Sequence, residues 1–447
     1  MTRSKSSKPR KLRPVNLGAA GIDIGSREHY VCAGATHPVR RFGCFTTDLQ
    51  QMASWLAACE VKTVAMEATG VYWIPAFQVL ESAGFEVVLV NAKHLKSVPG
   101  RKSDVQDCQW LQHLHECGLL APSFRPADPI VVLRSYLRQR KTLVREAARH
   151  LQRMQKALEQ MNVQLHKVVS AIAGETGQAI IGAIVDGERD PGVLADLRNF
   201  RVRRSRADYV AALTGDWREE HLFCLRQEWT LYHQLQEHIL ACESEITRRT
   251  ASLESVAATD AELPPAKNQK CDTALRRHLY RITAVDLTAI DGMSPPAVLS
   301  IIGEVGLDMT RWPSENHFAS WLKLCPNNRI TGGRARSTST LPTRNFAADV
   351  FRKCAENLAR SQTYLGAFYR RMRARKGGAY AVVATARKLA RIFYVVLRRK
   401  TPYQDLGKDH LDHVHRQRAL RSAVKRIRAL GYQLDSDQLQ PLAEAVR

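Results

Sequence analysis

The sequence predicts a chain of several domains, with a mixed α/β domain first, long helices next and a mainly α-helical region last. Three observations support this prediction. Short apolar runs with a period of two fill the first part of the chain, and apolar residues then recur every three or four positions. A polar stretch with two prolines, TDAELPPAKNQK, follows these helices. A chain of 447 residues is long enough for roughly two to four domains.

The first domain begins with three predicted strands that are joined by turns. Their sequences are AAGIDIG, HYVCAGA and VRRFGCF. A helix over LQQMASWLAAC, a strand over VKTVAME, a helix over IPAFQVLESAG and a strand over FEVVLVN follow, before a helix that begins near Asp104. Three antiparallel strands followed by alternating helices and strands predict a mixed sheet, in the order expected of a ribonuclease H-like fold.

Two long amphipathic helices are predicted after this domain. One apolar seam runs from Ala147 to Leu165 and a second from Leu222 to Ile246, with steps of three and four residues. We expect coiled-coil contacts, either between these two helices or across a second protomer. GERDPG and the basic stretch RNFRVRRSR interrupt the helical pattern between them.

A second globular region and a basic tail complete the predicted organisation. LTAIDGMSPPAVLSIIGEVG is typical of a helix-hairpin-helix that binds a phosphate, although a plain turn between two helices has the same pattern. The predicted boundaries are 1–17 for a basic disordered arm, 18–128 for the α/β domain, 129–258 for the coiled-coil helices, 259–270 for a linker, 271–405 for the second globular region and 406–447 for a basic helical tail.

The charge of the chain indicates a polyanionic partner. Lys and Arg total 67 against 43 Asp and Glu, so the formal net charge is +24, and nucleic acid is the most natural ligand. No apolar run of about 18 residues predicts a membrane span, and the basic N-terminus lacks the apolar stretch of a secretory signal. Ten cysteines without a C-x-x-C pair argue against a structural zinc site. We therefore expect a cytoplasmic protein.

Four carboxylates are the strongest candidates for chemistry. Asp104 and Asp107 share one helical turn, where two like charges favour a cation between them. First-turn acids behind the N-cap Ser103 are also common, so this pair alone is a weak signal. Asp23 lies in GIDIG and Glu67 ends VKTVAME, on strands that a ribonuclease H-like sheet places side by side. Together the four acids predict a site for two divalent cations, Mg²⁺ or alternatively Mn²⁺, that act on phosphodiesters.

The chain resembles the DEDD transposases of the insertion sequence one-ten family, recombinases that a bridge RNA guides. The resemblance covers nearly the whole chain and rests on GIDIGSREHYVCAG, AMEATGVYW, NAKHLKSVPGRKSDVQDCQWL, AIDGMSPPAVLSIIGEVG, FASWLKLCPNNRITGGR and YRRMRARKGGAYAVVATARKLARIFY. It implies a RuvC-like domain that supplies the four acids, a coiled coil that mediates dimer contacts, and a C-terminal transposase domain whose serine becomes covalently linked to DNA. It also implies double-stranded DNA at element ends and targets, a guide RNA, and a homodimer or tetramer.

The nucleophile is where the chain departs from the family pattern. The family's serine precedes a glycine, and the matching stretch CPNNRITGG has Thr331 in that place. An activated threonine hydroxyl can attack phosphorus. The alternative is that Thr331 is an ordinary turn residue with a structural role only. Ser337 and Ser339, in RARSTST, are alternative nucleophiles. The candidate nucleic-acid-binding residues near the acids and the hydroxyls are Arg101, Lys102, Arg329, Arg334 and Arg336.

Other interpretations stay open. A RuvC-like junction nuclease would cut DNA with metal-bound water and form no adduct, and a non-catalytic coiled-coil nucleic-acid-binding protein would not need Asp104. The threonine at the serine position also allows an inactive descendant of a mobile element. Three histidines near the acids could act in acid–base steps, although their spacing does not require it: His94, His113 and His115. Three tyrosines at helical spacing are expected to be packing groups: Tyr364, Tyr369 and Tyr394.

Overall fold

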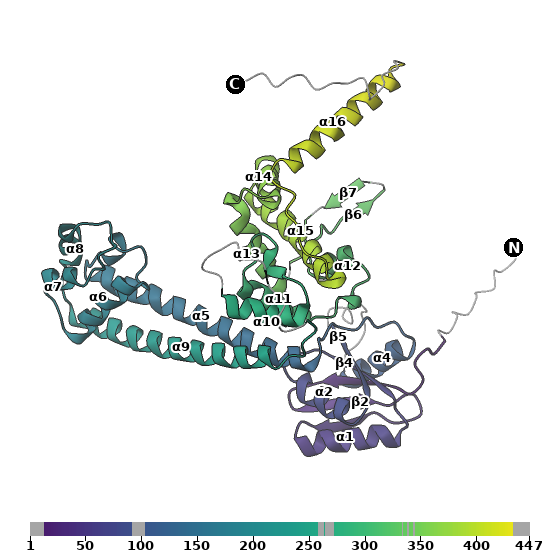
Figure 1. Ribbon diagram of the computed structural model, residues 1–447. Coiled ribbons are helices and arrows are strands. Elements are labelled where there is room, and N and C mark those ends of the chain that lie inside the picture. Colours follow the sequence, from purple (N-terminus) through teal and green to yellow (C-terminus); the bar gives the residue numbers. More distant parts are fainter. Residues whose placement is uncertain are drawn as a thin grey trace, which may run out of the picture. The chain divides into compact units, whose positions relative to one another are not determined.

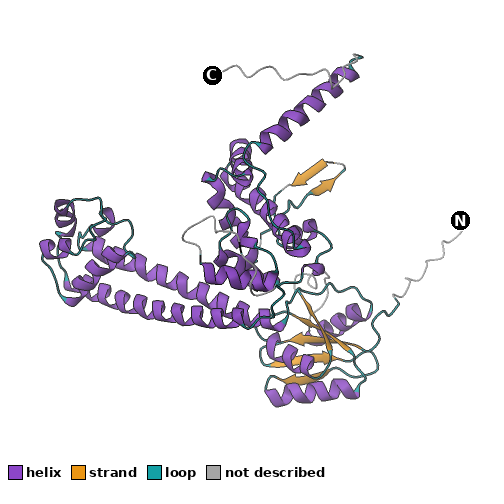
Figure 2. Ribbon diagram, in the orientation of Figure 1, coloured by secondary structure: helices purple, strands orange, loops and turns teal. Residues whose placement is uncertain are grey.

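The computed structural model describes residues 13–91, 103–257, 263, 272–332, 334–337, 339–342 and 345–431. The chain divides into two compact units, one that extends to Arg125 and one that begins at Pro126 (Figure 1). Most of the predicted N-terminal arm and almost all of the predicted linker lie outside the described residues. Strands are concentrated in the first unit, and the second unit is mainly helical (Figure 2).

A five-stranded mixed sheet with the order β3-β2-β1-β4-β5 forms the centre of the first unit. β1 pairs antiparallel with β2, and β2 with β3, whereas β1–β4 and β4–β5 are parallel. The strands are β1 (Ala19–Ile24), β2 (Glu28–Cys32), β3 (Arg40–Gly43), β4 (Thr63–Glu67) and β5 (Glu86–Val90). All five strands were predicted from the sequence, the first three from alternation and the last two from short apolar runs. The mixed α/β class is therefore confirmed, and the sheet is compatible with a RuvC-like domain.

Helices cover both faces of this sheet. One face, with Ile22 and Met66, packs against α1 (Thr46–Ala58) and α2 (Trp73–Ser82) in an apolar core. The opposite face, with Ala65, packs against Leu111 of α4 (Asp104–Glu116). Because side chains alternate along a strand, each position of β1 and β4 is committed to one of these two environments.

Two antiparallel helices of 33 residues begin the second unit, α5 (Asp128–Gln160) and α9 (Glu219–Ala251). Arg140 Nε donates to Glu243 Oε1 at 2.8 Å, and further along α5 His150 Nδ1 lies 2.5 Å from Glu228 Oε2. A later residue of α5 thus pairs with an earlier residue of α9, so the two helices run in opposite directions. The two predicted seams therefore pack against each other within one chain, but the first helix is shorter than predicted: α5 ends at Gln160, and Met161 and Leu165 follow it.

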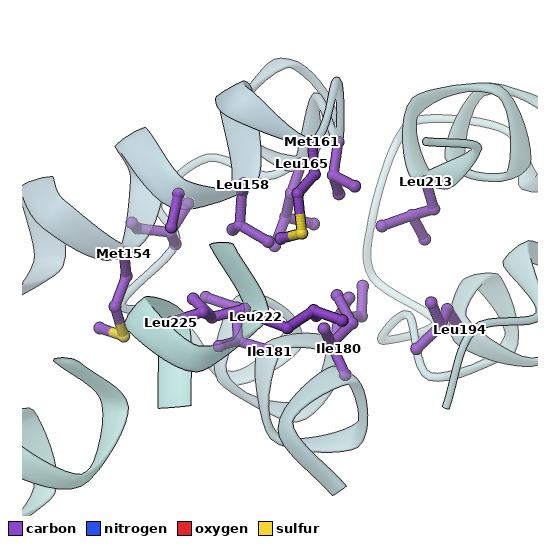
Figure 3. Close-up of a cluster of buried hydrophobic side chains, with 14 of the residues drawn as sticks. Met154, Leu158, Met161, Leu165, Ile180, Ile181, Leu194, Leu213, Leu222 and Leu225 are labelled. Atoms are coloured by element: carbon purple, nitrogen blue, oxygen red, sulfur yellow. The ribbon is translucent and has the colours of Figure 1, made fainter. Parts of the chain in front are cut away.

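Three shorter helices close the end of this pair where α5 finishes and α9 starts: α6 (Glu175–Asp186), α7 (Pro191–Asp196) and α8 (Arg206–Leu213). Their apolar side chains join those of the long helices in one buried cluster (Figure 3). The cluster includes Met154, Leu158, Met161, Leu165, Ile180, Ile181, Leu194, Leu213, Leu222 and Leu225. These helices, with the loop between α7 and α8, are called here the tip of the helix pair.

The rest of the second unit packs near the other end of the pair. Its helices are α10 (Thr273–Thr283), α11 (Pro295–Val305), α12 (Glu315–Trp321), α13 (Phe346–Asn357), α14 (Tyr364–Lys376), α15 (Gly378–Arg399) and α16 (His410–Ala429). Short 3-10 helices are η1 (Leu165–Lys167), η2 (Leu287–Ala289), η3 (Met309–Arg311) and η4 (Leu358–Arg360). α11 is joined to α5 by Arg138, whose Nε donates to Glu304 Oε1 at 2.8 Å. None of the described helices has the length and apolar character needed to cross a membrane.

Candidate active site

Two of the predicted acids lie near the carboxyl ends of neighbouring parallel strands: Asp23 is the last residue but one of β1, and Glu67 ends β4. Ile22 of β1 is in register with Met66 of β4, so the residue that follows each of them, Asp23 or Glu67, lies beside the other. Ile22 and Met66 are buried against α1 and α2. Since side chains alternate, Asp23 and Glu67 point to the opposite face, which α4 covers.

Contacts along α4 place its first turn over these strand ends. Gln112 Nε2 donates to the carbonyl oxygen of Ala19, at the start of β1, at 3.3 Å. Eight residues back along a helix cover about 12 Å and four residues forward along a strand about 13 Å. These steps lead to Asp104 on the helix and to Asp23 on the strand. The first turn of α4, which also carries Asp107, therefore lies level with Asp23.

Gly21 allows the close approach of α4 to β1. A Cβ atom at this position would lie 2.4 Å from the backbone nitrogen of Gln112 and 2.5 Å from the carbonyl oxygen of Cys108. Gly21 shares its sheet face with Asp23, two residues further on. Gly21 was not predicted as part of the site, although a glycine inside a strand is a signal of close backbone approach.

Three of the carboxylates act electrostatically on the fourth, Asp23. Burial raises the pKa of Asp23 most, and the carboxylates of Asp104, Glu67 and Asp107 raise it further, to about 6. A hydrogen bond from the backbone N–H of Ile24 opposes this rise in pKa. A carboxylate whose pKa is raised by neighbouring carboxylates lies in a negative potential, in which a cation would be stabilised. The structure therefore places Glu67, Asp104 and Asp107 near enough to Asp23 to affect its pKa, and the shared metal site stays a prediction.

The donor chemistry of this site fits a hard divalent cation. All four side chains offer carboxylate oxygens, the ligands that Mg²⁺ and Mn²⁺ prefer. Among the described residues, no three His, Cys, Asp or Glu side chains are already grouped so as to hold a metal ion. Ser103 Oγ accepts a hydrogen bond from the Gln106 N–H at 3.4 Å, so the predicted N-cap is also present. The capping and ion-binding interpretations of the first turn are thus compatible.

The candidate nucleophiles lie in the second unit, on a hairpin of β6 (Arg329–Thr331) and β7 (Arg334–Ser337). Thr331 is exposed and ends β6, and Gly332 follows with a φ of +56°. Ser337 is paired in register with Arg329. Ser339 is also exposed, and its carbonyl oxygen accepts from the N–H of Asn327 at 2.9 Å. The hairpin thus carries all three candidate hydroxyls within a few residues.

The predicted nucleic-acid-binding residues are only partly described. The strands include the backbone of Arg329, Arg334 and Arg336. Their side chains and that of Ser337 lie outside the described residues, as do Arg101 and Lys102 entirely. Their proposed contacts with phosphates stay predictions.

Most of the other candidate side chains are packing groups. Tyr369 and Tyr394 are buried, and the Tyr394 hydroxyl donates to the carbonyl oxygen of Trp312 at 2.7 Å. Tyr364 contacts Lys388 through its hydroxyl. Burial lowers the pKa of His115. His94 lies outside the described residues, and the ring of His113 packs against that of Trp110.

The predicted helix-hairpin-helix has features of a plain helical turn. α11 begins with Pro295 and Pro296, which have no N–H to offer a phosphate. A Cβ at Gly292, in the turn before α11, would lie 2.8 Å from the carbonyl oxygen of Cys354. This glycine therefore serves the packing of the turn against α13.

Two protein-family models match the chain. Residues 20–163 match a DEDD model described as a transposase, and residues 284–370 match the model of transposases of the IS116/IS110/IS902 family. The first match contains Asp23, Glu67, Asp104 and Asp107, and the second contains the β6–β7 hairpin. No curated protein matches the chain.

Proposed function

Because this chain belongs to the IS110 family of DEDD transposases and is a DNA transposase, we propose that four carboxylates and one hydroxyl act on the same DNA phosphate. The family implies DNA binding and dependence on a divalent metal ion. The observation that carries the proposal is the placement of Asp23 and Glu67 level with the first turn of α4, where the acids raise the pKa of Asp23.

Asp23, Glu67, Asp104 and Asp107 would hold Mg²⁺, with Mn²⁺ as the alternative. When bound, these ions supply stabilisation of the charge that develops on the phosphate and the leaving oxygen. The carboxylates themselves orient the reacting group at the carboxyl ends of β1 and β4. Glu67 is also positioned by Thr69, whose hydroxyl donates to Glu67 Oε1 at 2.8 Å.

Thr331 is the proposed nucleophile, with Ser337 and Ser339 as the alternatives. Its Oγ1 forms a bond to phosphorus while a P–O bond of the DNA breaks; the threonine proton leaves to solvent and the released deoxyribose oxygen takes one up. A hydroxyl end of another strand then attacks the ester, which rejoins the DNA and restores the threonine. Exposure of Thr331 at the end of β6 supports this role.

Partners beyond DNA are proposed from the family resemblance. A bridge RNA would supply the sequence information, and the net charge of +24 accommodates two nucleic acids. A homodimer or tetramer would form through coiled-coil contacts of the long helices. The arginines on the hairpin, with Arg101 and Lys102, would contact phosphates.

Covalent trapping tests the proposal. Purified protein is incubated with its own element-end DNA, the co-purified RNA and Mg²⁺, and adducts are separated on a denaturing gel and mapped by mass spectrometry. Asp104→Asn should abolish the adduct. Glu116→Gln is the matched control, because it neutralises a carboxylate at the other end of the same helix.

Isosteric variants locate the nucleophile. Thr331→Val keeps the shape of the side chain without its hydroxyl and should abolish the adduct, whereas Thr331→Ser should retain it. An adduct that survives in Thr331→Val but disappears in Ser337→Ala or Ser339→Ala would move the nucleophile. Cleaved ends without any adduct would support the junction-nuclease alternative, and intact DNA under all conditions would support a binding protein.

A further inference from the structure

The loop between α7 and α8 presents an exposed aromatic ring at the tip of the helix pair. This segment, residues 197–205, is called here the tip loop. The Phe200 side chain is 86% exposed, which is unusual for a large apolar group. The guanidinium carbon of Arg201 lies 5.1 Å from the centre of the Phe200 ring. A cation thus already lies against an aromatic group that the described part of the chain leaves largely exposed.

Neighbouring contacts hold the tip loop in place. The backbone N–H of Asn199 donates to Thr176 Oγ1 at 3.2 Å, and Asn199 Oδ1 accepts from the backbone N–H of Arg201 at 3.0 Å. Val202 packs against the buried cluster of the tip. Asn199 and Val202, the residues on either side of this pair, are anchored, so the Phe200 ring projects from a loop that is held in place. An exposed ring contributes none of the stabilisation that burial of a Phe side chain provides.

Positive charge surrounds the exposed ring. Residues 198–204, RNFRVRR, contain no acid. The nearby acids are already engaged. Asp196 accepts from Arg206 Nε at 2.6 Å and lies 3.7 Å from Arg198, Glu175 accepts from the Asn199 side-chain amide at 3.2 Å, and Asp208, on which Arg204 also acts, accepts from the Ser205 N–H. The exposed arginines of the loop are Arg201, Arg203 and Arg204. An aromatic group with three exposed cations is complementary to a polyanion that carries flat rings.

We propose that the tip loop is a nucleic-acid-binding site in which Phe200 stacks on an unpaired base and the arginines contact the adjacent phosphates. Stacking on an aromatic ring needs a base with a free face, which an unpaired nucleotide offers and a base inside a duplex does not. Charge complementarity favours this ligand over a protein partner or a second copy of the basic chain. Both RNA and DNA carry this chemistry.

The proposed site is on a different segment of the chain from the acids and the hairpin hydroxyls. It lies between the two segments that match the family models, 20–163 and 284–370. Binding at the tip loop needs neither a metal ion nor a covalent step. Its test can therefore be run in chelating buffer, so that failure of the tip-loop proposal is distinguishable from failure of the proposed catalytic mechanism.

Site-specific crosslinking tests the proposal on the full chain. Phe200 is replaced by the photoreactive benzoylphenylalanine, and the same replacement is made at Phe223 as the control. Phe223 lies on α9 and is 57% exposed, but it is outside the arginine-rich loop. Each protein is irradiated with single-stranded RNA, single-stranded DNA, or the duplex of the same sequence. We expect crosslinks from position 200 to the single strands, several-fold more than from position 223, and the stronger of the two arms identifies the source.

Affinity measurements complete the test. Phe200→Ala should weaken binding of the preferred single strand roughly ten-fold, and Phe200→Trp should retain it, because stacking depends on the aromatic face. Arg203→Gln with Arg204→Gln should make the salt dependence less steep by about 1.4 units of log–log slope, at about 0.7 per lost phosphate contact with a single strand. Crosslinks from position 200 mainly to a second chain or to the duplex, or unchanged affinity in Phe200→Ala, would overturn the proposal. An unchanged melting temperature verifies that each variant folds.

Discussion

Replacing Gly21 with alanine would test whether the approach of α4 to β1 positions the acids. The added Cβ would lie 2.4 Å from the nitrogen of Gln112 and 2.5 Å from the oxygen of Cys108, whereas ordinary contact begins at 3.4 Å. Both obstacles are backbone atoms, so no side chain can swing aside, and α4 must retreat by about 1 Å. Overpacking of this kind costs about 1–3 kcal/mol, and we expect the upper end of that range.

The displacement has two measurable consequences. A loss of about 3 kcal/mol corresponds to roughly 150-fold less protection from hydrogen exchange in α4, if its amides exchange through opening of this contact. A misplacement of about 1 Å at Asp104 and Asp107 should slow adduct formation by about 100-fold. Hydrogen–deuterium exchange of the α4 peptide and single-turnover trapping with Mg²⁺ measure the two effects separately.

Gly378→Ala is the matched control for this change. A Cβ at Gly378 would meet no atom within 4 Å, so the same added methyl group should leave both exchange and trapping rates unchanged. Wild-type protection of α4 together with a wild-type trapping rate in Gly21→Ala would refute the reasoning. Slower trapping with unchanged protection would show that Gly21 acts on the reaction in some way other than helix placement.

Three further predictions concern charge. In chelating buffer, Asp23→Asn should stabilise the first unit, because the raised pKa of Asp23 means that its ionisation is disfavoured in the folded state. The gain in free energy of unfolding should be absent near pH 4 and reach about 1–2 kcal/mol above pH 6, after allowance for partial exposure. Added Mg²⁺ should then raise the melting temperature of the wild type but not of Asp23→Asn. Burial lowers the pKa of His115, so the imidazole of the unfolded chain takes up a proton at a higher pH than that of the folded chain, and acid favours unfolding. In thermal melts, His115→Gln should therefore lose less stability than the wild type as the pH falls below 6.5. Glu304→Gln should destabilise the α5–α11 contact by about 1–3 kcal/mol in calorimetry, less than for a fully buried pair because Arg138 is 57% exposed.

Much of the first unit could be predicted from the sequence. Alternation with a period of two and short apolar runs are local patterns, so AAGIDIG, VKTVAME and FEVVLVN were identified as strands without tertiary information. The parallel pairing of the first and fourth strands then placed Asp23 beside Glu67, and the register Ile22–Met66 confirms this neighbour relation.

Other features depended on contacts between distant residues. The seams over residues 147–165 and 222–246 predicted helices with an apolar face but not the surface that covers it, and the structure pairs α5 with α9 within one chain. The exposed setting of Phe200 was likewise hidden in a basic stretch that the sequence marked only as a break between helices.

The sequence by itself determined the order of the candidate catalytic residues along the chain: Asp23, Glu67, the pair Asp104 and Asp107, and a late hydroxyl. Only the tertiary structure decided that α4 lies on β1 at Gly21, with its first turn level with Asp23. The physical reason is that the spacing of apolar residues along the sequence reflects the geometry of a single helix or strand. The distance between two elements depends on the atoms at their contact, and at Gly21 that distance is set by the absence of a single Cβ.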